Sequence, residues 1–320
     1  MRNGFIGATL GLMTLAAAPA AAMEIRGLAE IRYTRAFSSR AGADQNGAFA
    51  LGQFDLFVFQ PLTDRIDVLS EIVFETDRNH DGSAEIERLE VGYRFSDLLT
   101  LHAGRYHNRI GYWNTAFHHG VIYQTTIDRP RFLRFEDSGG IFPIHVIGLE
   151  ATGRFALGQN VLRYGLMGGN GARIDTTDHT LVPNVTADDN KNKLVTAELA
   201  FEPALPKGLR VGGFSSSSQV QGLPNGDPGL APLFQVDQNI RGSYAVYQLA
   251  LNDNDRIELL AEGFFIGDRS RFANRFFSGA RVLRSRRVRS GRPRRAVPAV
   301  RGVQPRRRRP VLQRPARRGL

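Results

Sequence analysis

The 320-residue chain contains no cysteine, which excludes disulfide bonds, cysteine-ligated metals and thiol catalysis. Beyond residue 22 it also lacks any uninterrupted apolar run approaching the roughly 18 residues that a membrane-spanning helix needs. In lipid, backbone polar groups can be satisfied only within helices or within closed barrels of strands. A membrane-embedded form of this chain would therefore have to be a β-barrel.

The first 22 residues have the features of a secretory signal peptide. Arg2 gives a positive start, residues 5–15 form an apolar stretch, and Ala20-Ala21-Ala22 provides small residues for cleavage. The mature chain is predicted to begin near Met23. The remainder is then either soluble in the periplasm or embedded in a membrane as strands.

Past this segment the dominant hydrophobic period is two, which indicates strands. In 84–95, for example, Leu89 and Val91 fall on one face, while Arg88, Glu90 and Arg94 fall on the other. Eleven segments carry this pattern, several of them about ten residues long, the length of a tilted membrane strand. They are 27–36, 51–60, 65–76, 84–95, 100–106, 143–156, 160–168, 193–202, 208–215, 242–251 and 256–265.

The connections between these segments alternate strictly in length. Short turns are predicted at 61–64, 96–99, 157–159, 203–207 and 252–255. Longer loops are predicted at 37–50, 77–83, 107–142, 169–192 and 216–241. Tight turns at one end and long loops at the other are typical of an up-and-down transmembrane barrel, whereas a soluble β-sandwich has no reason to sort its connections this way. The sequence therefore predicts an all-β, antiparallel, transmembrane up-and-down barrel over residues 23–277.

One stretch, 101–153, also carries a family resemblance. It contains A-G-R-Y-x-x-x-x-G-Y-W-N from Ala103, H-H-G from His118 and D-R-P-R-F-L-R-F-E-D-S-G-G from Asp128. This block resembles bacterial porin-type outer-membrane proteins distantly related to the phosphate-selective porins. The resemblance covers about a sixth of the chain specifically and implies a barrel with passive or selective permeation in the outer membrane of a Gram-negative bacterium. It does not imply a particular solute.

The long loop 107–142 is predicted to fold into the barrel and narrow it, because it is rich in aromatic and charged residues. An outer loop packed over the mouth of the barrel is the alternative. The proposed constriction residues are Trp113, His118, His119, Arg129, Arg131, Arg134, Glu136 and Asp137.

The polar face of each strand, formed by every second residue, is assigned to the lumen of the barrel. It includes the acids Glu30, Asp55, Asp67, Glu71, Glu75, Glu90, Glu150, Glu198, Glu202, Glu258 and Glu262. The arginines are Arg32, Arg88, Arg94, Arg154, Arg163, Arg210 and Arg256. Eleven acids against seven arginines predict a cation preference in the wide part of a pore.

Metal, cofactor and catalytic roles are not expected. His118 and His119 are adjacent, so on an extended chain they point to opposite sides and would not share one ion. The segment Asp77–Gly82 begins like a calcium loop, but its twelfth position is Arg88 instead of the bidentate glutamate. No G-x-S-x-G motif or recognisable Ser–His setting is present, so we predict that the chain is not an enzyme.

The C-terminal segment 278–320 differs from the rest. Residues 281–320 hold 16 arginines and no acidic, lysine or aromatic residue. The net charge of +11 comes from this tail, because 26 basic and 31 acidic residues remain without it. A basic arm for nucleic acid or anionic lipid is one interpretation, but it fits poorly with a barrel whose ends lie in the periplasm. GC-rich DNA translated in the wrong frame gives the same composition, so we predict a frameshift near 275–282, a disordered tail, a barrel that does not close and no nucleic-acid partner.

Two functions follow from these expectations. The first is a porin that lets small hydrophilic solutes or ions diffuse through a water-filled lumen narrowed by loop 107–142. The alternative is a non-conducting outer-membrane barrel that serves as a receptor, adhesin or enzyme scaffold. The expected partners are outer-membrane lipid and small hydrophilic solutes or ions, and homo-oligomerisation is left open.

Overall fold

The computed structural model describes residues 23–35, 47–76, 82–117, 142–177, 181–182, 191–227, 229–252, 255–273 and 275–289. It is almost entirely β-structure, with one short helix, α1 (Tyr112–Ala116), and a 3₁₀ turn, η2 (Pro224–Gly226). In the described part of the chain, no helix is long and apolar enough to cross a membrane. The predicted signal peptide 1–22 lies outside these residues.

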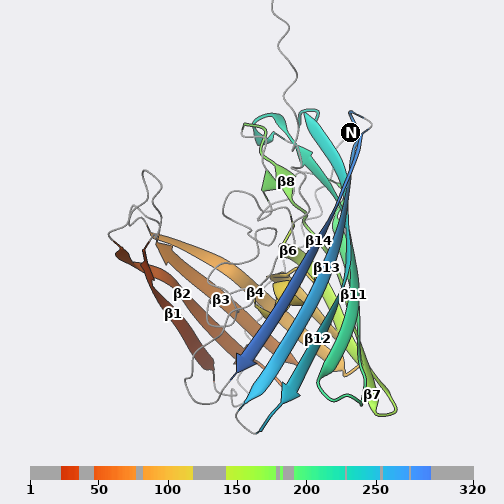
Figure 1. Cartoon of the computed structure of the whole chain (residues 1–320). Coiled ribbons are helices and arrows are strands. Elements are labelled where there is room, and N and C mark those ends of the chain that lie inside the picture. Colours follow the sequence, from red (N-terminus) through yellow and green to blue (C-terminus); the bar gives the residue numbers. More distant parts are fainter. Residues whose placement is uncertain are drawn as a thin grey trace, which may run out of the picture.

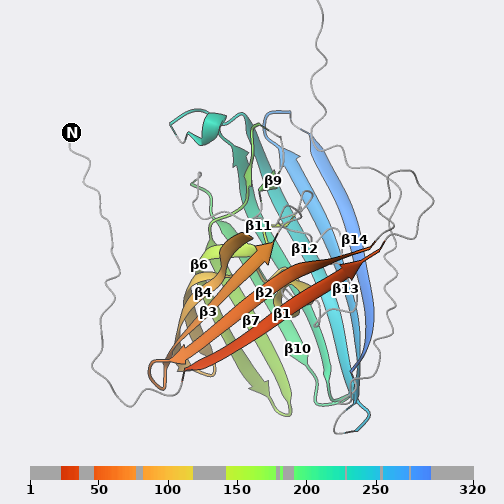
Figure 2. The same ribbon diagram turned by 90° about the vertical axis from the view of Figure 1, so that its left-hand side faces the viewer.

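Twelve strands form one antiparallel sheet. Their order in the sheet is their order in the sequence, and each strand pairs with the next, so β7 pairs with β10. They are β1 (Glu24–Thr34), β2 (Ala48–Pro61), β3 (Ile66–Thr76), β4 (Gly82–Ser96), β5 (Leu99–His107), β6 (His145–Leu157), β7 (Asn160–Gly169), β10 (Leu194–Glu202), β11 (Leu209–Gly222), β12 (Phe234–Ala250), β13 (Arg256–Ser270) and β14 (Phe276–Arg289). A separate hairpin joins β8 (Arg173–Ile174) to β9 (Leu181–Val182). The sheet curls, and its edges β1 and β14 do not pair with each other (Figures 1 and 2).

All eleven predicted strands are present. The connections at 35–47, 108–144, 170–193 and 223–233 are long as predicted, but the one between β3 and β4, 77–81, is no longer than the short turn 251–255. Several strands run further into the long connections than the pattern predicted. The predicted loop 216–241 is the clearest case, because β11 continues to Gly222 and β12 already begins at Phe234. The two strands stay paired over this extension, from Ser216↔Ile240 to Gly222↔Phe234, so backbone hydrogen bonding prolongs the sheet past the apolar segments.

The predicted start of the tail at residue 278 is wrong. β14 continues to Arg289 and pairs with β13 from Arg269↔Phe276 to Arg256↔Arg289. The arginine content argued against a strand, but strand alternation persists here, with Arg281 on the concave face and Val282 exposed on the convex face. Residues 290–320 lie outside the described part of the chain.

The two faces of the sheet differ as the period of two predicted. On the convex face, Leu89, Val91, Leu199 and Leu259 are between 42% and 53% exposed. On the concave face, Glu71 and Glu262 are 1% and 2% exposed. Side chains alternate across a strand, so each strand presents one apolar and one mainly polar row.

Candidate functional site: the inward segment and the charged concave face

The chain turns into the concave side of the sheet directly after β5. We call residues 108–117 the inward segment. Asn108 fixes its start, because its backbone N–H donates to the carbonyl of Ile144 at 2.6 Å and its side-chain amide donates to the carbonyl of Pro143 at 2.6 Å. Asn114 donates back to the carbonyl of Asn108 at 2.7 Å. Both ends of the long connection are therefore tied together inside the curve.

α1 lies within the inward segment, and a carboxylate from the opposite wall caps it. Glu262 of β13 accepts hydrogen bonds from the backbone N–H groups of Tyr112 at 2.6 Å and Trp113 at 3.2 Å. Free N–H groups at the start of a helix need such an acceptor. Gly111 precedes them with φ of 96°, and a β-carbon there would overlap Oε1 of Glu262. Glycine at 111 therefore permits the cap.

The inward segment packs on an apolar part of the concave face. Trp113, the only tryptophan of the chain, is 1% exposed. Its cluster draws on the inward segment, on residues 142–144 and on strands β10 to β13. The members are Ile110, Trp113, Phe117, Phe142, Ile144, Ala200, Phe214, Ile240, Tyr244, Val246, Leu260, Phe264 and Ile266. Burial of this many large side chains from both partners holds the segment against the sheet.

Arg109 links the inward segment to two acidic strands. Its guanidinium hydrogen-bonds to Glu150 of β6 and, at 3.0 Å, to Glu198 of β10. Glu198 also accepts from the hydroxyl of Tyr244 at 2.6 Å. Gly165 of β7 lies between the two acids, and a β-carbon there would overlap the Arg109 side chain. The missing side chain at 165 provides the space in which the arginine crosses the strand.

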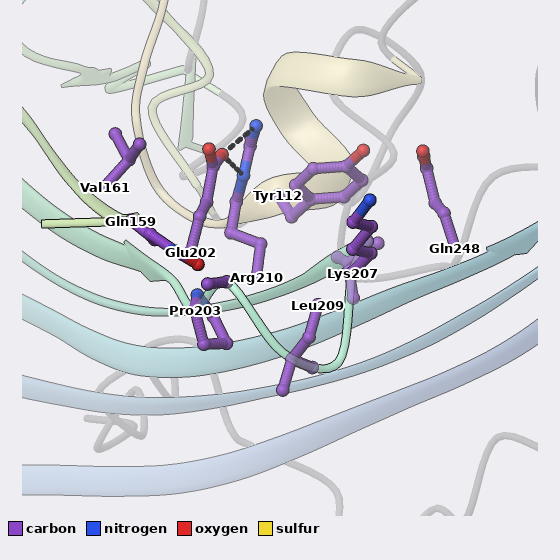
Figure 3. A pocket seen from close by; sticks show the side chains of 12 residues that line it. Tyr112, Gln159, Val161, Glu202, Pro203, Lys207, Leu209, Arg210 and Gln248 are labelled. Carbon is purple, nitrogen blue, oxygen red and sulfur yellow. Dashed lines mark hydrogen bonds and ion pairs between the residues drawn. The ribbon is translucent and has the colours of Figure 1, made fainter. Parts of the chain in front are cut away.

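Below α1, toward the short turns, lies a pocket of about 490 Å³ (Figure 3). Tyr112 forms one wall, and the guanidinium of Arg210 lies 5.8 Å from the centre of its ring. Glu202 accepts hydrogen bonds from Arg210 at 2.6 Å and from Arg163 at 2.9 Å. Lys207 also lines the pocket. The Glu202 carboxylate therefore accepts hydrogen bonds from two guanidinium groups at this end of the concave face.

The other predicted lumen residues occupy the same face but form local pairs. Glu71 accepts from Arg88 at 2.5 Å, and Glu258 accepts from Gln248 at 2.7 Å. Glu90 lies 3.6 Å from His102. Glu75 and Arg94 are exposed, near opposite ends of β3 and β4. The concave side of β3 to β5 is thus charged, whereas that of β11 to β13 carries the apolar cluster around Trp113 beside polar side chains such as Gln238 and Glu258.

Most of the predicted constriction residues cannot be placed. Trp113 lies inside the curve, as described above, but seven others lie outside the described residues. These are His118, His119, Arg129, Arg131, Arg134, Glu136 and Asp137. Most of the calcium-like segment, residues 77–81, lies outside as well. Within the described ranges, no group of three histidine or acidic side chains could hold a metal ion.

Sequence reasoning missed a cluster formed by Glu87, Arg105 and His145. Nε2 of His145 lies 2.7 Å from Glu87, and Arg105 donates to the backbone carbonyl of Glu87 at 3.0 Å. The alternating pattern could not reveal this cluster, because β4 has a β-bulge. Glu71 of β3 pairs with Arg88, but the next residue of β3, Ile72, pairs with Ile86. Glu87 is the extra residue, and a strict period of two cannot place it.

No protein-family model matches the chain, and no curated protein matches its sequence. A loop L8 deletion mutant of OmpT, an outer membrane protein of Vibrio cholerae, is 11% identical with a TM-score of 0.38, covering 84% of this chain and 88% of that chain. The in-vitro folded trimer form of OmpT is 10% identical with a TM-score of 0.39, covering 83% and 84%. The outer membrane channel DcaP of Acinetobacter baumannii is 10% identical with a TM-score of 0.38, covering 83% and 77%. Such values transfer no function, and the resemblance to phosphate-selective porins stays a prediction.

Proposed function

We propose that this chain is an outer-membrane porin of a Gram-negative bacterium, through which small hydrophilic solutes or ions diffuse. The main support for this proposal is that the convex face of the sheet is apolar where the concave face is charged. Large apolar side chains stand exposed on the convex face, among them Leu89, Leu166 and Phe265. An exterior rich in exposed apolar side chains suits contact with lipid, and a charged interior suits contact with water.

The proposed path runs along the charged side of the interior. The inward segment covers the apolar cluster on the concave face of β11 to β13, so solutes would pass between it and the charged faces of β3 to β6. Several acids on this path are neutralised by arginine, as in the pairs of Glu71 with Arg88 and Glu150 with Arg109. The cation preference predicted from eleven acids and seven arginines therefore depends on how many of the acids are paired with an arginine.

A non-conducting barrel is the second candidate, and the apolar cluster around Trp113 favours it. A packed interior is what a barrel serving as a receptor, adhesin or scaffold would have. Conductance in planar bilayers separates the two. We expect discrete channel openings from the full chain refolded into lipid. Correctly inserted protein without openings would favour the second candidate.

Cysteine labelling provides a direct test of the face assignment. We expect the lumen-side variants Glu90→Cys and His102→Cys to react with a membrane-impermeant thiol reagent. Their neighbours Val91→Cys and Leu101→Cys should stay unlabelled, because adjacent residues of a strand face opposite sides. The native chain has no cysteine, so it gives the background. Equal labelling of both sets would contradict a membrane-spanning sheet with this phase.

A further inference from the structure

The pocket below α1 offers an apolar surface beside its charged groups. Half of its twelve lining residues are apolar or aromatic, and Tyr112 of α1 contributes a ring. These six are Tyr112, Val161, Pro203, Ala204, Leu209 and Val246. The volume of about 490 Å³ lies within the range of about 300–1,000 Å³ that is usual for small-molecule sites. The pocket can therefore take a small organic molecule and contact its apolar part.

The acid that lines this pocket is already paired. Oε1 of Glu202 accepts hydrogen bonds from Nε of Arg163 at 2.9 Å and from Nε of Arg210 at 2.6 Å. Two guanidinium groups therefore compensate one carboxylate, and this part of the pocket keeps an excess of positive charge. Opposite charges attract, so the excess favours an anion over a cation.

Lys207 adds a further positive charge, which is not compensated. It lies in the short turn between β10 and β11 and lines the pocket, and within the described ranges its ammonium makes no hydrogen bond or ion pair. Figure 3 shows Lys207, Arg210 and Gln248 extending from the sheet toward Tyr112. An ammonium group has three N–H donors, so Lys207 can donate to an anion that enters the pocket.

We propose that this pocket binds small organic carboxylates with an apolar body, such as aromatic acids, and that Lys207 recognises the carboxylate. This inference rests on the proposed porin function, for which it names one class of solute. The carboxylate accepts from the Lys207 ammonium, while the apolar body lies against Tyr112 and the aliphatic side chains of the lining. Inorganic phosphate has the charge but no apolar surface, and a neutral aromatic molecule has the surface but no charge. Neither therefore matches both parts of the pocket.

Calorimetric titration of the full chain, refolded in detergent, tests this site with benzoate as the probe. We expect benzoate to bind, and acetate, benzyl alcohol and inorganic phosphate to bind at least about tenfold more weakly. Lys207→Met should weaken benzoate binding about tenfold, because a charge-assisted hydrogen bond is lost, whereas Lys207→Arg should retain most of it. Lys191→Met is the matched control, since Lys191 is also exposed and unpaired in the described part of the chain but precedes β10 at its other end.

Benzoate binding that is equal in Lys207→Met and in the native chain would overturn the proposal, and so would benzyl alcohol binding as tightly as benzoate. Phosphate binding as tightly as benzoate would overturn it in favour of a site for inorganic anions. Calorimetry reports on the pocket whether or not the chain conducts. Benzoate binding without channel openings would therefore support the site and contradict the porin function, whereas channel openings without benzoate binding would refute the site alone.

Discussion

Replacing Gly111 with alanine is expected to release α1 from Glu262 and to move Trp113 from its buried site toward water. The added β-carbon would overlap Oε1 of Glu262, which accepts the N–H groups of Tyr112 and Trp113. Without the cap, these donors and the Glu262 carboxylate lose their partners together, and each such loss costs about 1–3 kcal/mol. The fluorescence of the single tryptophan should shift to the red, and in bilayers the channel conductance should rise.

Gly158→Ala is the matched control for this change. Gly158 has φ of 65° in the short turn between β6 and β7, and a β-carbon added there would meet nothing within 4 Å. Both variants place alanine at a positive φ, which costs about 1–3 kcal/mol, but only Gly111→Ala adds the overlap. Unchanged tryptophan emission in Gly111→Ala would show that the inward segment does not depend on the Glu262 cap.

The strand pattern predicted the two faces well, because alternation is a local property. Arg88 and Glu90 oppose Leu89 and Val91 in the sequence, and the structure keeps them opposed. The same rule fails at Glu87, where the bulge adds a residue to β4. The structure also differs from the prediction beyond residue 278, where the arginine content argued against a strand but backbone pairing with β13 extends β14 to Arg289.

The alternating pattern of the strands could not predict which side chains contact one another within the site. The pattern assigned Glu198 to the lumen but could not show that it binds Arg109, which is 89 residues away. Likewise, Leu260 and Phe264 are apolar residues on the phase assigned to water, and they are explained only by Trp113 packing against them. A period of two places a side chain on a face, but the residue that covers that face comes from tertiary structure.

Replacement of Arg109 with methionine is expected to have the largest effect on stability. Arg109 is the shared partner of Glu150 and Glu198, whose side chains are 7% and 11% exposed. Removing one member of a buried ion pair leaves an uncompensated charge and costs up to about 3–5 kcal/mol. The variant should unfold at clearly lower urea concentration, measured by the loss of heat-modifiable mobility after refolding in lipid.

The exposed pair of Arg154 and Asp97 supplies the control, because it repeats the arginine–carboxylate contact at 2.8 Å in water. The hydrogen bond from Arg154 lowers the pKa of Asp97, but water can replace it, so Arg154→Met should leave the unfolding midpoint almost unchanged. Neutralising both acids as well, in Arg109→Met/Glu150→Gln/Glu198→Gln, should recover part of the lost stability, since the amides can be buried at lower cost than the carboxylates. If Arg109→Met and Arg154→Met unfold alike, the Arg109 bridge contributes no more than a surface contact, and the inward segment is held by its apolar cluster, the Glu262 cap and the Asn108 hydrogen bonds.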